Sequence, residues 1–429
     1  MVAIRTRHSG QRRFAGPFNK MIAIAASVLS VASSAAAQPS ALANWDNLLD
    51  GLKTAGARAD AQLPPGLTAQ DQAEVAVMKL GALMVGYLNI VHADPDHPIF
   101  RPHISLYANY LAPNSDTLYY TARIDGSGVY RLRGEAGDIP IVNLSPRRTY
   151  SPGGTVTAAP FVDYDLVQHR KGPEGQIDVI LSGTRPPGYT GDWLYLDSRA
   201  DTFSVRFVSD DWGHQKDPRL SIERLDRPSR KSRPTADEIN RALAALPDAV
   251  ATGVASYASY PANLENKIGT NQIKESDYTG VGVLTNQHYM EMVWDFRPDE
   301  ALILETSLPK CRYWSVLLAD PLFATLDWVN NQASLNRSQA RVDSDGRMRV
   351  VIAHADPGVP NWLDTVGRSK GALQWRWMGC DSTPTPTVKR VPLAEVRRNL
   401  PPDTPTVTAA QRDQSLRERR ALAQMRRQW

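Results

Sequence analysis

The chain has 429 residues, of which 42% are hydrophobic and 22% are charged, and its formal net charge is +4. This length exceeds what one hydrophobic core usually serves, so it favours two domains with added helices. Five of the 49 basic residues and no acidic residue lie within 1–37, which leaves 44 basic and 45 acidic residues in the remainder. That balance removes the clustered positive charge that nucleic-acid binding requires, and no nucleic-acid partner is expected.

Residues 1–37 have the parts of a secretory signal peptide. Basic residues precede an apolar run over 21–31, and Ala35–Ala37 provides a small-residue cleavage site. We expect cleavage after Ala37 and a periplasmic or secreted protein. Met21 is an alternative start, and Arg12-Arg13 leaves twin-arginine export open beside the general route. No later segment is expected to span a membrane.

The region 38–100 is predicted to be helical. Leucines recur at helical spacing over 40–62, and Thr68 followed by Asp71 predicts the start of a second, largely apolar helix. His92, His97 and His103 follow with aspartates between them, which is either a metal site or a polar connector. The prolines and the spacing favour the connector, so no metal site is predicted.

The segment 101–230 is predicted to form a first β domain. Short apolar runs separated by glycine- and proline-rich turns are typical of a sandwich or jelly roll. Asp125-Gly126, between 118–124 and 129–133, predicts a hairpin. A helical linker over 231–275 follows, with Thr235 as the first helix cap.

The segment 276–390 is predicted to form a second β domain, followed by a basic helical tail over 391–429. Val350–Ala353 and Leu373–Met378 are predicted strands, and 340–342 is predicted to pair with 348–352 around Asp345-Gly346. A faint repeat aligns 193–206 with 303–316, which is compatible with two related domains. The predicted fold class is therefore α+β, mainly β: two β-sandwich or jelly-roll-like domains with N-terminal, linking and C-terminal helices.

Cys311 and Cys380 are the chain's two cysteines. Cys311 begins one predicted strand and Cys380 ends another, so antiparallel neighbours would bring the two thiols together. In an exported protein a pair of cysteines more often forms a disulfide than stays free. We therefore predict a Cys311–Cys380 disulfide.

Several motifs resemble a family of known sequence but unassigned activity. They are Cys311–Ser315, Asn336 with Gln339-Ala340, Asp345-Gly346, Asp356–Asp364 and Arg376-Trp377. Together they resemble the domain of unknown function numbered 1214. Upstream, Asn114–Tyr119 and the stretch 125–134 resemble the segment that usually precedes that domain and is related to family 1254. The resemblance covers 104–380 and implies β-rich domains of jelly-roll type, but it carries no catalytic residue to this chain.

The loop 354–368 gathers the strongest cluster of polar side chains. A histidine and two carboxylates near aromatic residues suit acid–base chemistry on a small apolar molecule. The predicted catalytic residues are His354, Asp356 and Asp364, and the predicted ligand-binding residues are Tyr313, Trp314, Asn361, Trp362 and Arg376. Each also has a structural explanation, as a turn residue, a strand-end cap or a core side chain.

Two functional hypotheses follow from that cluster. The first is an exported hydrolase or lyase that acts on a small apolar or aromatic molecule. The second is a non-catalytic envelope protein that binds a ligand or a partner through the same aromatic surface. No dinucleotide or phosphate-loop fingerprint occurs, and no cofactor is expected.

Overall fold

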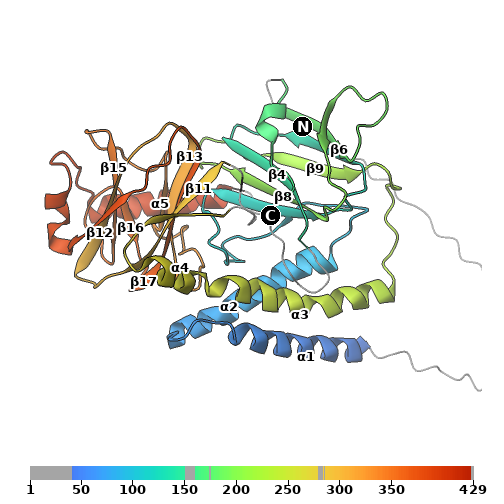
Figure 1. The fold of residues 1–429 in the computed structure, drawn as a ribbon, viewed down its shortest axis with the longest axis horizontal. Helices are drawn as coiled ribbons and strands as arrows, with labels where there is room; N and C mark the ends of the chain where they lie inside the picture. The colour runs from blue at the N-terminus through green and yellow to red at the C-terminus, as the bar shows by residue number, and fades with distance from the viewer. Residues whose placement is uncertain (1–40, 150–159, 173–174, 279–283, 285, 427–429) are drawn as a thin grey trace, which may run out of the picture. The chain divides into compact units, whose positions relative to one another are not determined.

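The computed structural model describes residues 41–149, 160–172, 175–278, 284 and 286–426. The expected signal peptide at 1–37 lies outside these residues. From Asn44 onward the chain forms one compact unit. The fold is α+β and mainly β, as predicted, and its strands form two sandwich-like domains (Figure 1).

The first sandwich consists of a five-stranded and a four-stranded sheet. Their strand orders are β1-β2-β8-β4-β5 and β7-β6-β3-β9. Leucine, isoleucine and valine side chains between the sheets form its core together with Tyr130 and Phe203. The strands are β1 Arg101–Pro102, β2 Thr117–Arg123, β3 Tyr130–Glu135, β4 Ile141–Arg147, β5 Tyr164–Asp165, β6 Gln176–Ser182, β7 Asp192–Tyr195, β8 Thr202–Val208 and β9 Arg219–Arg224.

The second sandwich has the same construction. Its sheets have the orders β10-β11-β17-β13-β14 and β16-β15-β12-β18. Trp294, Trp314, Trp375 and Trp377 lie in its core among methionine and aliphatic side chains. The strands are β10 Lys274–Ser276, β11 Gln287–Asp295, β12 Glu300–Ser307, β13 Cys311–Ala319, β14 Ser334–Asn336, β15 Arg347–Ala353, β16 Trp362–Asp364, β17 Lys370–Cys380 and β18 Thr387–Pro392.

The two sandwiches are topological duplicates. Adding nine to each strand number of the first sandwich gives the strand order of both sheets in the second. Even the parallel pairs correspond, because β6 with β7 matches β15 with β16 while the other strand pairs are antiparallel. The repeat predicted from 193–206 and 303–316 is therefore misaligned, since β7 and β8 correspond to β16 and β17.

Two of the predicted strand pairings are wrong. The strands on either side of Asp125-Gly126 lie in different sheets, because β2 pairs with β1 and β8 whereas β3 pairs with β6 and β9. The turn, closed by a hydrogen bond from Gly128 N to Asp125 O of 2.8 Å, therefore crosses between the sheets. Residues 340–342 form no strand; a turn at Asp343–Gly346 leads directly into β15.

Helices cover the described N-terminal region and join the two sandwiches. They are α1 Ala41–Asp60, α2 Ala69–Gly86, the π-helical turn η1 Tyr87–Val91, the 3-10 turn η2 Leu166–His169, α3 Ala236–Ala258, α4 Tyr260–Ile268, the 3-10 turn η3 Leu393–Asn399 and α5 Ala409–Met425. The predicted cap of Thr68 with Asp71 is confirmed as a reciprocal capping box, and Thr408 with Gln411 forms the same motif at the start of α5. Thr235 caps α3 through Glu238.

Helix α2, predicted to be largely apolar, is buried on one side only. Val75, Met78 and Ala82 lie in a core shared with α3, but Val77 and Leu80 are 65% and 66% exposed. The stretch 69–91 is also long and apolar enough to cross a bilayer, with 39% of its most apolar window buried. The expectation that no later segment reaches that length is therefore wrong, although core helices of water-soluble proteins meet the same criterion.

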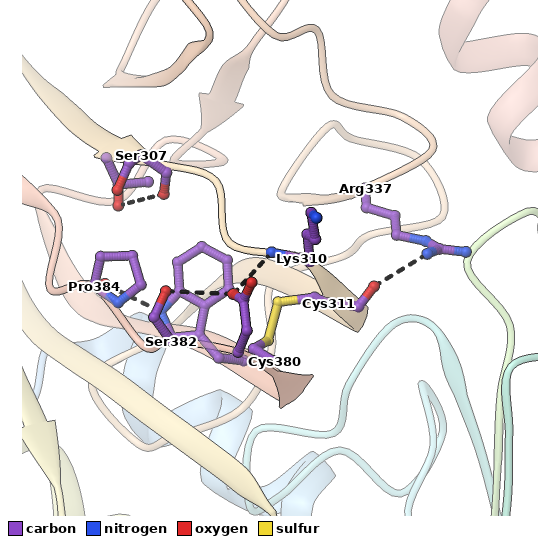
Figure 2. Close-up of a disulfide and its surroundings, with 10 residues drawn as sticks. Ser307, Lys310, Cys311, Arg337, Cys380, Ser382 and Pro384 are labelled. Atoms are coloured by element: carbon purple, nitrogen blue, oxygen red, sulfur yellow. Dashed lines mark hydrogen bonds between the residues drawn. A yellow bond between two sulfur atoms is a disulfide. The ribbon is translucent and has the colours of Figure 1, made fainter.

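The predicted disulfide is confirmed. Cys311 and Cys380 face each other at the ends of the antiparallel strands β13 and β17, with their Cα atoms 4.0 Å apart. Figure 2 shows the bridge beside Lys310, whose backbone N–H donates to Asp381 Oδ1 at 3.0 Å, and beside Pro384, whose carbonyl accepts from Trp377 Nε1 at 3.1 Å. The bridge therefore joins neighbouring strands where the chain leaves the sheet.

The last helix, α5, contacts the rest of the chain through arginines as well as through apolar side chains. Arg412 donates to Asp356 at 2.9 Å, and Arg419 donates to Ser334 Oγ at 2.6 Å. Leu422 and Ala423 pack beside Trp212 and Trp328, but Met425 is 67% exposed. The helix therefore contacts both sandwiches through its basic face.

Candidate functional site at the junction of the sandwiches

His354 and Asp356, two of the predicted catalytic residues, form hydrogen bonds within the protein. His354 Nε2 lies 3.1 Å from the carbonyl oxygen of Phe296, and its Nδ1 lies 3.0 Å from Thr365 Oγ1. Asp356 accepts from the backbone N–H of Gly358 at 2.8 Å and from Arg412. These contacts fix the turn and attach it to α5.

The other loop residues show the same behaviour. Asp364 accepts from the backbone N–H of Val366 at 2.8 Å, and its pKa is raised by burial and by the charge of Asp356. Asn361 donates to the carbonyls of Arg341 and Arg349 and accepts from Arg341 N. Trp362 donates to Ala353 O at 3.0 Å. Neither pocket described below is lined by His354, Asp356 or Asp364.

The predicted ligand-binding residues are dispersed. Trp314 packs in the core of the second sandwich against Trp375 and Trp377, with ring centroids 6.0 and 6.2 Å apart. Asn361 lines a small surface pocket with Arg341 and Arg349. Tyr313 and Arg376 lie on the opposite face of the β13–β17 pair from Trp314, and both contact the first sandwich. The structure thus brings Tyr313 and Arg376 together and separates them from the loop.

Tyr313 belongs to a buried polar cluster centred on Asp116. The carboxylate of Asp116 accepts from Tyr313 OH at 2.6 Å, from Asn336 Nδ2 at 2.8 Å and from Trp212 Nε1 at 2.9 Å. Its side chain is buried, and so are those of its partners. Because Tyr313 and Asn336 come from the second sandwich and Asp116 and Trp212 from the first, this cluster joins the two domains.

Burial governs the protonation of this cluster. It raises the pKa of Asp116, although the hydrogen bonds from Tyr313 and Asn336 oppose the rise. Burial and the neighbouring Asp116 together hold the pKa of Tyr313 well above its ordinary value. Asn114 adds a further donor, with its Nδ2 2.8 Å from Tyr313 OH. The phenol therefore stays protonated and donates to the carboxylate.

The loop that leads into β2 is strained next to this cluster. Leu111 and Ala112 have φ of 69° and 43°, values that residues with a Cβ seldom adopt. The backbone N–H of Ala112 donates to Phe323 O at 2.7 Å, and its carbonyl accepts from Arg376 Nη2 at 2.9 Å. Phe323 itself has φ of 65°. Contacts with the second sandwich therefore hold the loop in its unfavourable conformation.

A pocket opens beside this loop, between the start of β2 and α5. Its wall is mostly apolar and includes the aromatic side chains of Tyr119, Tyr120, Trp212 and Trp328, while Ser115 and Arg426 are among its polar residues. Arg426 is fixed there by Asp217 at 2.8 Å and by the carbonyl of Asp116 at 2.9 Å. An apolar wall with few placed polar groups is the usual composition of a small-molecule site.

A second buried network lies on the same face of the second sandwich. Glu291 accepts from Tyr278 OH at 2.7 Å and from Gln374 Nε2 at 2.5 Å, and also from Tyr260 OH. Gln374 in turn accepts from Arg376. Among the residues that the structure describes, no group of three or more His, Cys, Asp or Glu side chains is placed to hold a metal ion.

Sequence reasoning missed the junction. Asp116 and Asn336 occur only in the motifs that carry the family resemblance, and Trp212 and Arg426 lie in none of the motifs named above. The available signal was the clustering of Asn114–Tyr119 with Tyr313 and Asn336 in one resemblance. Their contact could not be read from the sequence, because Asp116 lies 197 positions from Tyr313 and 220 from Asn336.

The comparisons with known proteins agree with this fold. Residues 299–381, from β12 to the end of β17, match the model of a family described as a protein of unknown function, DUF1214. No curated protein matches the chain.

Two solved structures are similar to this one. The crystal structure of an uncharacterized protein from Burkholderia cenocepacia has a TM-score of 0.73 and 25% sequence identity, covering 82% of this chain and 97% of that one. The VPA0106 protein from Vibrio parahaemolyticus has a TM-score of 0.42 and 12% identity, covering 80% of this chain and 100% of that one. The first likeness extends well beyond the segment matched by the family model.

Proposed function

We propose that this protein binds a small molecule with an aromatic or apolar body at the junction pocket, without catalysing a reaction there. The observation that carries the proposal is the pocket wall of Tyr119, Tyr120, Trp212 and Trp328, to which Ser115 from the same loop as the strained Leu111 and Ala112 also belongs. Strain held by surrounding contacts is common at ligand sites, since an ordered loop requires no reorganisation on binding.

Thermal unfolding in the presence of indole tests this proposal. We expect indole to raise the melting temperature, because a ligand that binds only the folded state stabilises it by mass action. Trp328→Leu should abolish the rise, since Trp328 forms part of the wall. The matched control is Trp45→Leu on α1, where the side chain is 56% exposed, and it should respond like the wild type. An unchanged indole response in Trp328→Leu would contradict the proposal.

A hydrolase or lyase remains the second candidate because of Asp364. Its pKa is raised, and both Asp356 and His354 lie close enough to influence its charge. A carboxyl group with a raised pKa next to a histidine suits general acid–base work. Asp364→Asn would then abolish turnover of any substrate found by screening aromatic esters, while leaving indole binding intact. Turnover that survives Asp364→Asn would reject this candidate.

We also propose that the protein is exported and that 101–230 is related to family 1254. The disulfide between β13 and β17 supports export, because such bonds persist in oxidising compartments. The duplicated strand order supports a common origin of the two sandwiches. Mass spectrometry of the protein purified from the periplasm or medium should find Gln38 at the N-terminus. Recovery in the cytoplasm with residues 1–37 retained would contradict export.

A further inference from the structure

Helix α2 and the η1 turn carry an apolar stripe on the side turned away from the core. Val77, Leu80, Met84 and Tyr87 follow one another at alternating steps of three and four residues. Val77, Leu80 and Tyr87 are exposed, whereas the residues of α2 that pack into the core lie on its opposite side. An exposed apolar stripe of this kind marks an interaction surface.

Helix α1 carries a second stripe with the same spacing. It consists of Trp45, Leu49, Leu52 and Gly56, of which Trp45 and Leu49 are exposed. A Cβ atom added at Gly56 would lie 3.8 Å from Lys79 Nζ of α2. The α1 stripe therefore lies on the side of α1 that adjoins α2, and we call the two stripes together the α1–α2 face.

The chain does not use the α1 stripe for its own packing. Leu48, Ala55 and Ala59 are the buried residues of α1, and they lie on a different side of the helix. On that side α1 runs alongside α3 (Figure 1), where a Cβ atom added at Gly51 would lie 2.8 Å from Pro247 Cγ. The exposed stripe therefore stays available to a partner.

The spacing of both stripes indicates a helical partner. Apolar side chains at alternating steps of three and four residues form a seam that a second helix fills, as in coiled coils. A stable interface buries roughly 800 Å² on each partner, which is more than one short helix provides. The α1–α2 face offers two helices.

Two charges beside the α1 stripe fit a second copy of this chain. Asp46 and Lys53 are exposed, lie on one flank of the stripe and are one heptad apart. In the described part of the chain, the ion pairs of α1 involve Arg58 and Asp60 instead. Flanking charges beside such a seam set the orientation of the paired helices, and opposite signs one heptad apart suit an antiparallel pair.

A lipid surface fits this face less well. Helices that lie on membranes are rich in lysine and arginine on their polar side. Helices α1 and α2 together carry five acidic and three basic residues. The charge of this region therefore favours a protein partner over an anionic bilayer.

We infer that the protein forms a two-fold symmetric dimer through the α1–α2 face, with the two α1 helices antiparallel. Leu49 of one copy packs against Leu52 of the other, and Asp46 of each copy comes beside Lys53 of the other. Two-fold symmetry makes each of these contacts occur twice. The interface goes beyond the proposed function, because no residue of α1 or α2 lines the junction pocket.

Sedimentation equilibrium of the purified protein tests the inference. The wild type should be a dimer. Lys53→Asp and Asp46→Lys should each weaken association at least about tenfold, because like charges would then face each other across the seam. The double variant Asp46→Lys with Lys53→Asp should recover the wild-type affinity, because exchanging both charges restores each opposite-sign pair. A monomeric wild type would overturn the inference, and so would a double variant as weak as the single ones.

A matched control separates the seam from charge reversal in general. Lys267→Asp makes the same change at an exposed position of α4 and should leave the dimer affinity unchanged. Leu49→Gln should give a monomer whose melting temperature and circular dichroism show a folded chain.

Vesicles of phosphatidylglycerol test the other occupant. A wild type that stays monomeric and binds these vesicles, with the binding lost in Leu49→Gln, would overturn the dimer and assign the face to a membrane. Trp328→Leu should leave the dimer intact, so the dimer and the indole pocket can fail independently.

Discussion

Asp116 is the residue through which donors from both sandwiches meet. Its carboxylate accepts from Trp212 in one sandwich and from Tyr313 and Asn336 in the other. Removing a buried acceptor of this kind costs more stability than its hydrogen bonds contribute. The surrounding donors are then left unsatisfied, because no water reaches them.

Asp116→Asn tests this role. The amide places an N–H group where donors already point, so we expect a loss of about 1–3 kcal/mol in unfolding free energy. Urea denaturation measures it. Asp299→Asn makes the same change at a surface pair with Arg297, whose side chains are both 72% exposed, and should change stability by less than about 1 kcal/mol. Equal effects of the two variants would contradict a special role for Asp116.

Asp320 gives a second prediction for a single residue, which concerns the dependence of stability on pH. Burial raises its pKa to about 6, while its Oδ1 accepts from the backbone of Leu322 and Ala324. The folded state therefore binds this proton more tightly than the unfolded state does. Between about pH 4 and pH 6 the folded state holds more protons, so this group's contribution to stability falls as pH rises.

Asp320→Asn should remove that contribution, because an amide keeps the Oδ1 acceptor but cannot ionise. Urea denaturation of the wild type and the variant at pH 4.5 and pH 7 measures the difference. Relative to the variant, the wild type should lose stability on going to pH 7, by up to about 3 kcal/mol. A wild type that gains stability relative to the variant would contradict the assigned direction.

Among the elements, the strand pair β13–β17 is buried on both faces. One face of this strand pair holds Trp314, Trp375 and Trp377 in the core, and the other faces the first sandwich with Tyr313, Ser315 and Arg376. The period-two alternation predicted for Leu373–Met378 is present, but both faces of the strand are buried. Alternate side chains therefore point into the core of the second sandwich and into the interface with the first, and neither face is turned to solvent. The disulfide closes one end of this pair.

Removing the bridge should therefore weaken the whole strand pair. The cysteines are 69 positions apart, and a loop of that size is stabilised by roughly 4 kcal/mol in the chain-entropy view. A double Cys311→Ala and Cys380→Ala variant should show a lower urea midpoint, and denatured, unreduced wild type should contain no titratable thiol. Two free thiols per chain would show that the bond does not form.

For the whole molecule, buried contacts between the sandwiches imply that they unfold together. The part-buried Arg312 of the second sandwich also pairs with Asp165 of the first, with Nη2 to Oδ1 at 3.1 Å, and donates to Pro140 O at 2.7 Å. We expect a single thermal transition, with calorimetric and van't Hoff enthalpies in agreement. Tyr313→Ala, which empties the centre of the interface, should split it. Two transitions in the wild type would show that the domains are independent.

Sequence reasoning succeeded where the deciding contacts are local and failed where they are distant. The cap of Thr68 with Asp71 was predicted because a capping box lies within four residues. The prediction of a hairpin at Asp125-Gly126 was wrong because a turn sequence does not determine whether the two strands it joins lie in the same sheet. The duplication was misaligned because similar residues were matched along the chain, whereas the corresponding strands are identified by their order in the sheets. The junction depends on contacts about 200 positions apart.

The position of β8 and β17 in the chain has a kinetic consequence. Each is the central strand of its five-stranded sheet, between β2 and β4 or between β11 and β13, yet it follows both neighbours in sequence. Until that strand inserts, its neighbours expose open edges, so folding should be slow and prone to association at those edges. Refolding at rising protein concentration should therefore give a falling yield of native protein, with the associated fraction measured by light scattering.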